Sequence, residues 1–296
     1  MLFRSAIQNN LPERGTAYCI AEDHVNANLL FAGTEFGVYF SINGGEKWVQ
    51  LKSGLPTIAV RDMEIQKREN DLVIATFGRG FYVLDDYTPL RSITKETLEK
   101  EAVIFPIKDA WMYVESFPLG IRGKGFLGES YFTTPNPKPG AVFTYYLKED
   151  IKTIKEKRKE AEAEKIKNNQ PPYYPSIDSL RLEDEQTAPH LLFTIADDAG
   201  NVVRRIKTGA SKGMKRITWD FRYAPFSPVS LNTPDEDNPF GSNETGYFAL
   251  PGNYKVSISK YEDGVYTQLT QPQTFTCKAL NAASLAAPDK MALDNF

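Results

Sequence analysis

Short apolar runs alternate with turn residues through the first 90 residues. Each run has four to seven residues and is bounded by glycine, asparagine or aspartate, a pattern typical of strands and turns rather than helices. We therefore predict strands at residues 17–23, 29–32, 37–40, 47–51, 60–66, 72–76 and 80–84.

Part of this pattern repeats at a spacing of 43 residues. Leu29 aligns with Leu72, and Gly37 aligns with Gly80. The other aligned pairs are Phe31 and Ile74, Ala32 and Ala75, Tyr39 and Tyr82, and Ile20 and Met63. A period of about 40–45 residues built of short strands predicts propeller blades. Because a propeller needs several blades and the chain shows two, we expect it to belong to a larger protein.

The chain after residue 94 has a different organisation. Residues 94–102 predict a short helical turn, and the Lys- and Glu-rich residues 150–169 favour a solvent-exposed helix, with a partner-binding helix as the alternative. Turn signals separate several further strands, as expected for a β-sandwich. These strands are predicted at residues 102–107, 110–115, 142–148, 190–196, 202–207, 215–221, 252–260 and 265–277.

The segment Ser41–Trp48 carries the most specific local motif, Ser-Ile-Asn-Gly-Gly-Glu-Lys-Trp. Asn43 can accept backbone hydrogen bonds in a turn, Gly45 suits a position where a side chain would clash, and Trp48 can pack across the hairpin. With Ser41, these residues fit the Asp-box pattern. Residues 1–90 thus resemble Asp-box propellers, in particular the sortilin/VPS10-like and BNR-repeat proteins of large bacterial secreted chains. The resemblance implies a structural role for the box.

Residues 75–86 resemble the closing blade of that bacterial group. The second copy lacks the box, since Leu84 aligns with Ser41 and no Gly-x-x-Trp follows Asp86. A modified last blade would have this character.

A second resemblance covers the sandwich region. The segments 199–206, 213–220 and 250–256 are similar, in this order, to the immunoglobulin-like module of the flagellar hook-capping protein. The resemblance implies that Trp219 anchors the core and that the module stiffens, spaces or docks.

The expected fold is therefore mostly β. A partial Asp-box propeller of about two blades occupies residues 1–105, and an immunoglobulin-like sandwich with a charged helical excursion near 150–169 occupies 106–280. Residues 281–296 form a tail and could begin a helix.

Composition narrows the function. The net charge of -3 indicates no nucleic-acid partner, and no apolar run is long enough to span a membrane. Cys19 and Cys277 fall in different predicted domains, so we expect them to be unpaired. We expect no metal and no cofactor, although 235–238 could hold Ca²⁺ through oxygen ligands as an alternative to a solvated loop.

Glu35 and Arg79 are the candidate ligand-binding residues, because they lie in corresponding turns of the two copies. Contact with a ligand at a central funnel is one interpretation, and a solvated rim is the other. His24 has the character of a loop histidine, and the glycine-rich residues 120–128 that of a loop. Tyr173, Tyr174 and Phe240 could form a docking surface or pack a loop.

The leading hypothesis is a non-catalytic binding and scaffold segment of a large secreted or cell-surface propeller protein, with a protein or glycan partner and an extracytoplasmic location. The remaining blades of the parent chain would be further partners. The alternative is part of a glycoside-hydrolase-like, sialidase-like enzyme with its catalytic blades upstream. A self-standing chain that completes a propeller by oligomerisation is a third interpretation.

Overall fold

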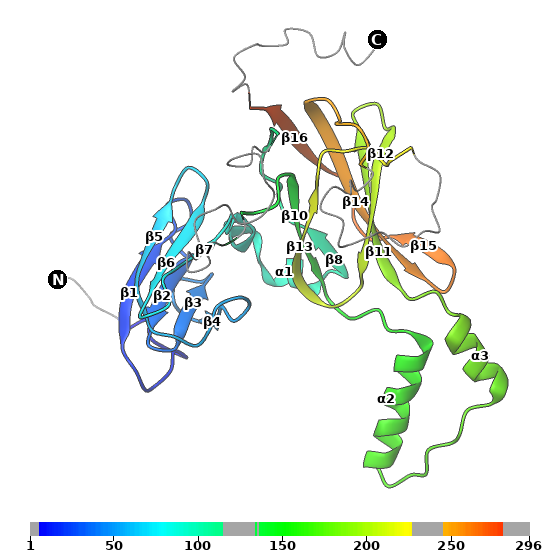
Figure 1. Ribbon diagram of the computed structural model, residues 1–296. Helices are drawn as coiled ribbons and strands as arrows, with labels where there is room; N and C mark the ends of the chain where they lie inside the picture. Colours follow the sequence, from blue (N-terminus) through cyan, green and yellow to red (C-terminus); the bar gives the residue numbers. More distant parts are fainter. Residues whose placement is uncertain (1–5, 115–133, 135, 227–244, 281–296) are drawn as a thin grey trace, which may run out of the picture. The chain divides into compact units, whose positions relative to one another are not determined.

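The computed structural model describes residues 6–114, 134, 136–226 and 245–280. The chain divides into two compact units, with the boundary in the sequence between Leu98 and Glu99 (Figure 1). The predicted domain limits at residues 105 and 280 stay predictions. Three of the features considered above lie outside the described residues: the loop at 120–128, the segment 235–238 with Phe240, and the tail at 281–296.

Two antiparallel sheets form the first unit, and the predicted strands are confirmed. The first sheet has the order β1-β2-β3-β4, with β1 at Ala17–Glu22, β2 at Leu30–Thr34, β3 at Gly37–Ser41 and β4 at Val49–Gln50. The second has the order β5-β6-β7, with β5 at Val60–Gln66, β6 at Asp71–Thr76 and β7 at Phe81–Leu84. The 3-10 helix η1 (Thr88–Ser92) and α1 (Lys95–Glu99) follow.

The strand register corrects the sequence alignment within the repeat. In β1 and β5, and again in β3 and β7, residues 43 positions apart occupy the same place. In β2 and β6 the place of Leu30 is taken by Leu72, a spacing shorter by one residue. The alignment of Leu29 with Leu72 was therefore wrong. A one-residue shift moves a side chain to the other face of a sheet.

This shift explains how the two sheets pack. Phe31 of β2 and Leu29, which directly precedes β2, belong to one buried core with Leu72 and Ile74 of the second sheet. Leu30, which corresponds to Leu72, lies on the opposite face of β2 with Ala32 and Trp48. The sheets thus meet through opposite faces, as successive blades of a propeller must. Each fully buried Leu, Ile or Phe side chain contributes about 1.5–3 kcal/mol to stability.

The second unit is a β-sandwich. One sheet has the order β13-β10-β8, and the other has the order β12-β11-β14-β16-β9, with β15 paired to β14. The strand bounds are β8 Ala102–Ile104, β9 Ala110–Met112, β10 Ala141–Leu147, β11 His190–Asp197, β12 Val202–Gly209, β13 Gly213–Trp219, β14 Gly252–Glu262, β15 Val265–Gln268 and β16 Gln273–Ala279.

Aromatic side chains fill the sandwich core. Phe143 of one sheet meets Phe193 and Phe275 of the other, with ring centroids 6.5 and 5.1 Å apart. Trp219 is fully buried against Tyr254, at 5.1 Å. The mostly-β class, with a partial propeller and a sandwich, is confirmed by these two units.

Two predicted elements of the second unit differ from the structure. Residues 265–277 form two strands rather than one, because Pro272 has no N–H for a ladder and the chain bulges where Leu269 donates to Ile258. The predicted helix begins at Ile154 (α2, Ile154–Lys167), and an unexpected helix, α3 (Ile177–Glu185), follows it. Cys19 and Cys277 are free, as predicted.

Candidate functional site

Glu35 and Arg79 lie at the same end of neighbouring sheets, in the β2–β3 and β6–β7 turns, and both are exposed. The turns are closed alike, since Thr34 Oγ1 donates to the carbonyl of Gly37 at 3.0 Å and Thr76 Oγ1 to that of Gly80 at 2.7 Å. The second turn is one residue longer. The two candidates therefore share a turn but not a position within it, and their role in ligand binding stays a prediction.

A stacked arginine stands at the same end of the sheets. The Cζ atom of Arg61 lies 4.0 Å from the centroid of the Tyr18 ring and 5.1 Å from that of Phe77. Tyr18 and Arg61 are the extra residues of β-bulges in the innermost strands β1 and β5, and they lie 43 positions apart. Bulges re-aim side chains, and a stacked guanidinium keeps its N–H edges available for an acceptor.

This Tyr18–Arg61–Phe77 group was missed from the sequence. The 43-residue repeat aligns Tyr18 with Arg61. An aromatic residue and an arginine at equivalent positions of the two copies could have indicated this group. The bulges that bring the two side chains together are not visible in an apolar pattern.

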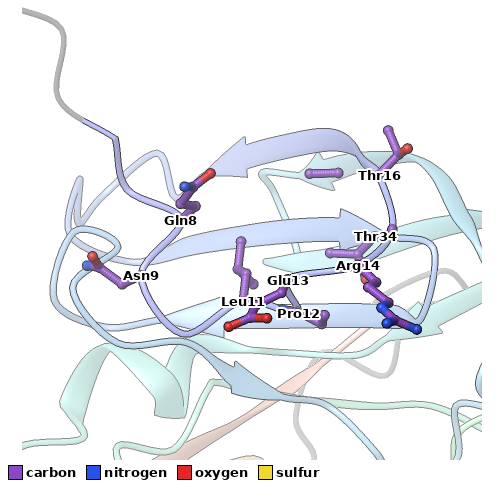
Figure 2. A pocket seen from close by; sticks show the side chains of 10 residues that line it. Gln8, Asn9, Leu11, Pro12, Glu13, Arg14, Thr16 and Thr34 are labelled. Atoms are coloured by element: carbon purple, nitrogen blue, oxygen red, sulfur yellow. The ribbon is translucent and has the colours of Figure 1, made fainter.

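A polar hollow lies at the edge of the first sheet (Figure 2). Its volume is about 380 Å³, and it lies between the segment 8–17 and Thr34. Glu13 and Arg14 contribute charged side chains, and the nearby Glu35 donates its backbone N–H to the carbonyl of Thr16 at 3.0 Å. The hollow thus adjoins the turn that carries Glu35.

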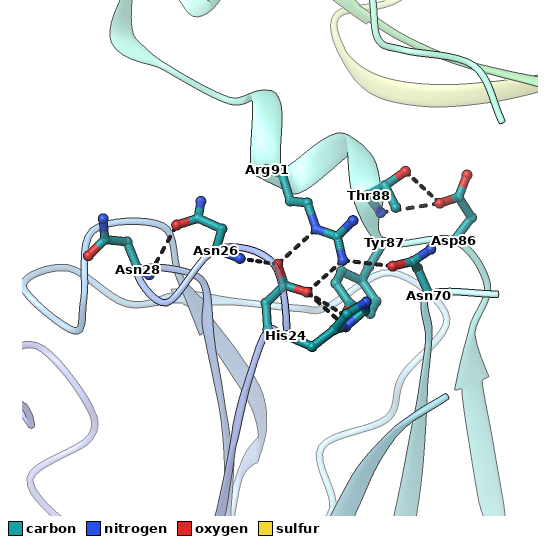
Figure 3. Close-up of polar contacts among 9 residues, drawn as sticks. His24, Asn26, Asn28, Asn70, Asp86, Tyr87, Thr88 and Arg91 are labelled. Atoms are coloured by element: carbon teal, nitrogen blue, oxygen red, sulfur yellow. Dashed lines mark hydrogen bonds and ion pairs between the residues drawn. The ribbon is translucent and has the colours of Figure 1, made fainter. Parts of the chain in front are cut away.

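The opposite end of the sheets holds a buried ion-pair network (Figure 3). Arg91 Nε and Nη2 donate to the two carboxylate oxygens of Asp23 at 2.8 and 2.6 Å, and Tyr87 Oη donates to the same carboxylate at 2.6 Å. Arg91 Nη2 also donates to Asn70 Oδ1 at 2.7 Å. The network joins the loop after β1, the β5–β6 turn and η1.

The electrostatics of Asp23 follow from these contacts. Burial alone would raise the pKa of the Asp23 carboxyl, but hydrogen bonds from Arg91, Tyr87 and the Asn26 backbone lower that pKa to about 2. Burial and the bond to Asp23 raise the pKa of the Tyr87 phenol. Asp23 therefore stays ionised, with its side chain closed off from solvent, and holds the two sheets together.

His24 lies in the loop beside this network, with Nδ1 3.6 Å from Asp23 Oδ1. Within the described part of the chain, no three His, Cys, Asp or Glu side chains gather as metal ligands would.

The predicted Asp-box residues form a closed turn after β3. Gly45 N–H donates to Ser41 Oγ at 2.9 Å, and Lys47 N–H donates to Asn43 Oδ1 at 3.0 Å. Gly45 has a φ of 91°, a conformation that favours glycine. Trp48 is buried, and its indole N–H donates to the carbonyl of Ile7 at 2.7 Å.

Comparisons with known proteins add little to this geometry. No family model and no curated protein matches the chain. One similar solved structure is PorZ, an essential bacterial surface component of the type-IX secretion system of Porphyromonas gingivalis, at 14% identity and a TM-score of 0.22. The match covers 89% of this chain and 30% of PorZ.

Two structures of the extracellular domain of BT4673 from B. thetaiotaomicron match at 10% and 11% identity, with TM-scores of 0.20 and 0.21. The matches cover 90% and 91% of this chain, and 25% and 26% of the two BT4673 chains. The chain thus spans less than a third of the structures it matches, and likenesses at these scores carry no inference about its function. Among the described residues, no helix has the length and apolarity to cross a bilayer.

Proposed function

We propose that this chain is a non-catalytic binding and scaffold segment of a larger extracytoplasmic protein. Residues 1–105 would be two blades of an Asp-box propeller, and 106–280 a sandwich that spaces or docks. The ligand would be a protein or a glycan, and the further blades would come from the parent chain.

One observation carries the propeller proposal: the same sheet face is buried in the first sheet and uncovered in the second. Val38 is 0% exposed, whereas Phe81, at the same place in β7, is 77% exposed. Val83, at the place of the half-buried Phe40, is also exposed. An apolar face of this kind on a repeat unit is where the next unit packs.

The charged residues on the uncovered face of the second sheet also support another blade as its neighbour. On the uncovered face, Asp62 and Glu64 of the innermost strand take the places of Cys19 and Ala21. Both carboxylates are exposed. The covering blade would therefore pair apolar side chains with Phe81 and Val83, and basic side chains with the two carboxylates.

The binding role is supported by the side chains gathered at one end of the sheets. Arg61 between Tyr18 and Phe77 offers N–H donors beside aromatic surface, a combination that suits acidic or ring-shaped ligand groups. Glu35 and Arg79 lie in the turns at this end. The bidentate pair of Asp23 and Arg91 is instead enclosed at the opposite end of the sheets, where it connects parts of the fold.

A two-part experiment tests the proposal on the whole chain. Incubation with fluorogenic glycosides, including a sialoside, should give no turnover, and a glycan array should give saturable binding. Arg61→Ala and Arg79→Ala should weaken that binding at least tenfold. Arg68→Ala is the matched control, because Arg68 is exposed in the β5–β6 turn at the other end of the sheets. Turnover by the wild-type chain would contradict the non-catalytic role, and variants that bind as the wild type does would contradict the binding surface.

A further inference from the structure

An arm of two helices projects from the sandwich (Figure 1). It consists of α2, α3 and the connecting segment Asn168–Ser176. No residue of α2 is buried, and the apolar stripe that would place this helix in a core is absent from it. The arm therefore does not serve to form a hydrophobic core, and its presence calls for another explanation.

A bidentate ion pair from Arg158 joins the two helices of the arm, and a second pair lies within α2. Arg158 Nε and Nη2 donate to the carboxylate of Glu183 at 2.5 and 2.9 Å, and Arg158 Nη1 donates to Glu162 at 2.6 Å. Glu183 is the buried residue of α3. A bidentate arginine–carboxylate pair fixes geometry as well as energy, so the helices keep one arrangement.

The base of the arm is fixed to the sandwich. Lys157 Nζ donates to Glu262 at 2.8 Å, and Gln186 Nε2 donates to Asp263 Oδ1 at 2.8 Å, both at the β14–β15 turn. Gln186 Oε1 also accepts the backbone N–H of Ile154. Both ends of the helical hairpin are thus tied to one turn, and its far end is held away from the sheets.

The far end carries the sequence Gln170-Pro-Pro-Tyr-Tyr-Pro175. Tyr173 and Tyr174 are 82% and 80% exposed, and Pro171 and Pro172 are exposed as well. Three prolines fix φ near −65°, and each residue that precedes a proline is restricted to extended or polyproline II conformations. Helix boundaries close the segment on both sides, with Asn169 at a φ of 55° and Ser176 as the N-cap of α3.

We propose that this arm presents Pro171 and Tyr174 as a polyproline II docking face for a partner protein that has a groove of aromatic side chains. A polyproline II helix has three residues per turn, so positions 171 and 174 share a face. Pro175, which would share a face with Pro172, is half-buried. Grooves lined by aromatic side chains recognise such preformed segments because little conformational entropy is lost on binding. The surface lies in the second unit and does not depend on the propeller interpretation of the first.

The test uses the whole chain and an isotopically labelled WW domain as the probe, since the groove of this domain binds proline-rich segments. Titration should give saturable shifts of the groove resonances. Pro171→Ala and Tyr174→Ala should each weaken binding at least tenfold, and Tyr173→Ala, on a different face, should change it less than threefold. These side chains are highly exposed, so the variants should fold as the wild type does, and circular dichroism of each variant checks this.

A second pair of variants tests presentation. Arg158→Ala releases the helices without touching the proline segment and should weaken binding two- to fivefold through lost pre-organisation. Arg181→Ala, an exposed arginine of α3, is the charge-matched control and should have no effect. Absence of saturable binding, equal effects of Tyr173→Ala and Tyr174→Ala, or self-association of the chain through this segment in sedimentation would each overturn the proposal.

Discussion

The two sheets of the first unit share a design but differ in what covers them. Both have a bulge at the start of the innermost strand, at Tyr18 and Arg61. A threonine hydroxyl closes the β2–β3 turn in the first sheet and the β6–β7 turn in the second. In the first sheet both faces are covered, one by the second sheet and the other around Trp48 by the segment that contains Leu11. In the second sheet, one face carries Phe81 and Val83 into solvent. The difference teaches that equivalent faces of two similar sheets can differ in burial, and our proposal assigns the exposed face of the second sheet to a neighbouring blade.

The largest expected effect separates equivalent faces of the two sheets. Phe31 is fully buried, with its ring 5.1 Å from that of Tyr87, so Phe31→Ala should cost about 3–5 kcal/mol of unfolding free energy. Phe81→Ala removes an exposed ring on the corresponding face of β7 and should cost less than about 0.5 kcal/mol in this chain. Urea unfolding, monitored by hydrogen exchange of amides in β2 and β6, measures the loss of unfolding free energy in each variant. Similar costs would break the comparison.

The ion-pair network tests whether the two sheets unfold together. Asp23→Asn leaves Arg91 without its carboxylate partner in a mostly buried site, and it should cost about 3 kcal/mol. Asp86→Asn, which keeps a hydrogen-bond acceptor for Thr88 in the same region, is the control and should cost much less. If Asp23→Asn destabilises only one of the sheets in hydrogen exchange, the sheets are not one cooperative unit.

Acid should weaken the same connection. The folded pKa of Asp23 is about 2, below the unfolded value of about 3.9, so its contribution to stability is complete above the unfolded pKa and is lost as pH falls from about 4 towards 2. The contribution amounts to about 2–3 kcal/mol. Wild-type stability should thus fall more steeply over this range than that of Asp23→Asn, as measured by urea unfolding at each pH. Parallel curves would contradict the assignment.

A smaller effect should distinguish the turns that follow β3 and β7. Ser41→Ala leaves the buried N–H of Gly45 without its acceptor and should cost about 1–2 kcal/mol. Thr88→Val removes the hydroxyl that donates to Asp86 in a half-buried site and should cost about 0.5–1 kcal/mol. Thermal unfolding of the two variants measures the difference. A larger cost for Thr88→Val would show that the second turn is no weaker than the first.

Local patterns predicted most of the strands, because glycine and aspartate mark the turns and apolar alternation marks the faces. The predicted alignment of β2 with β6 was wrong by one residue, and the reason is physical. Every residue of this strand is buried, so Leu30, Phe31 and Ala32 show no alternation that would say which face each belongs to. The same limit applies to α3, whose amphipathic pattern is short and follows a proline.

The candidate site was only partly predictable. Glu35 and Arg79 could be placed in turns from the sequence because turns are local, and their role in binding stays a prediction. The contact of Arg91 with Asp23, by contrast, joins residues 68 positions apart. The stacking of Arg61 on Tyr18 depends on two bulges and on the packing of two sheets. The 43-residue repeat aligns Tyr18 with Arg61, but the contact between them follows from tertiary structure.

Hydrogen exchange of β3 and β7 tests the central claim most directly, with this chain compared against the extended parent protein that we propose. If the uncovered face receives another blade, amides of β3 (Gly37–Ser41) are protected in both proteins, and amides of β7 (Phe81–Leu84) become protected only in the extended one. Equal protection of β7 in both proteins, or rapid exchange of β7 in the extended protein, would contradict the claim.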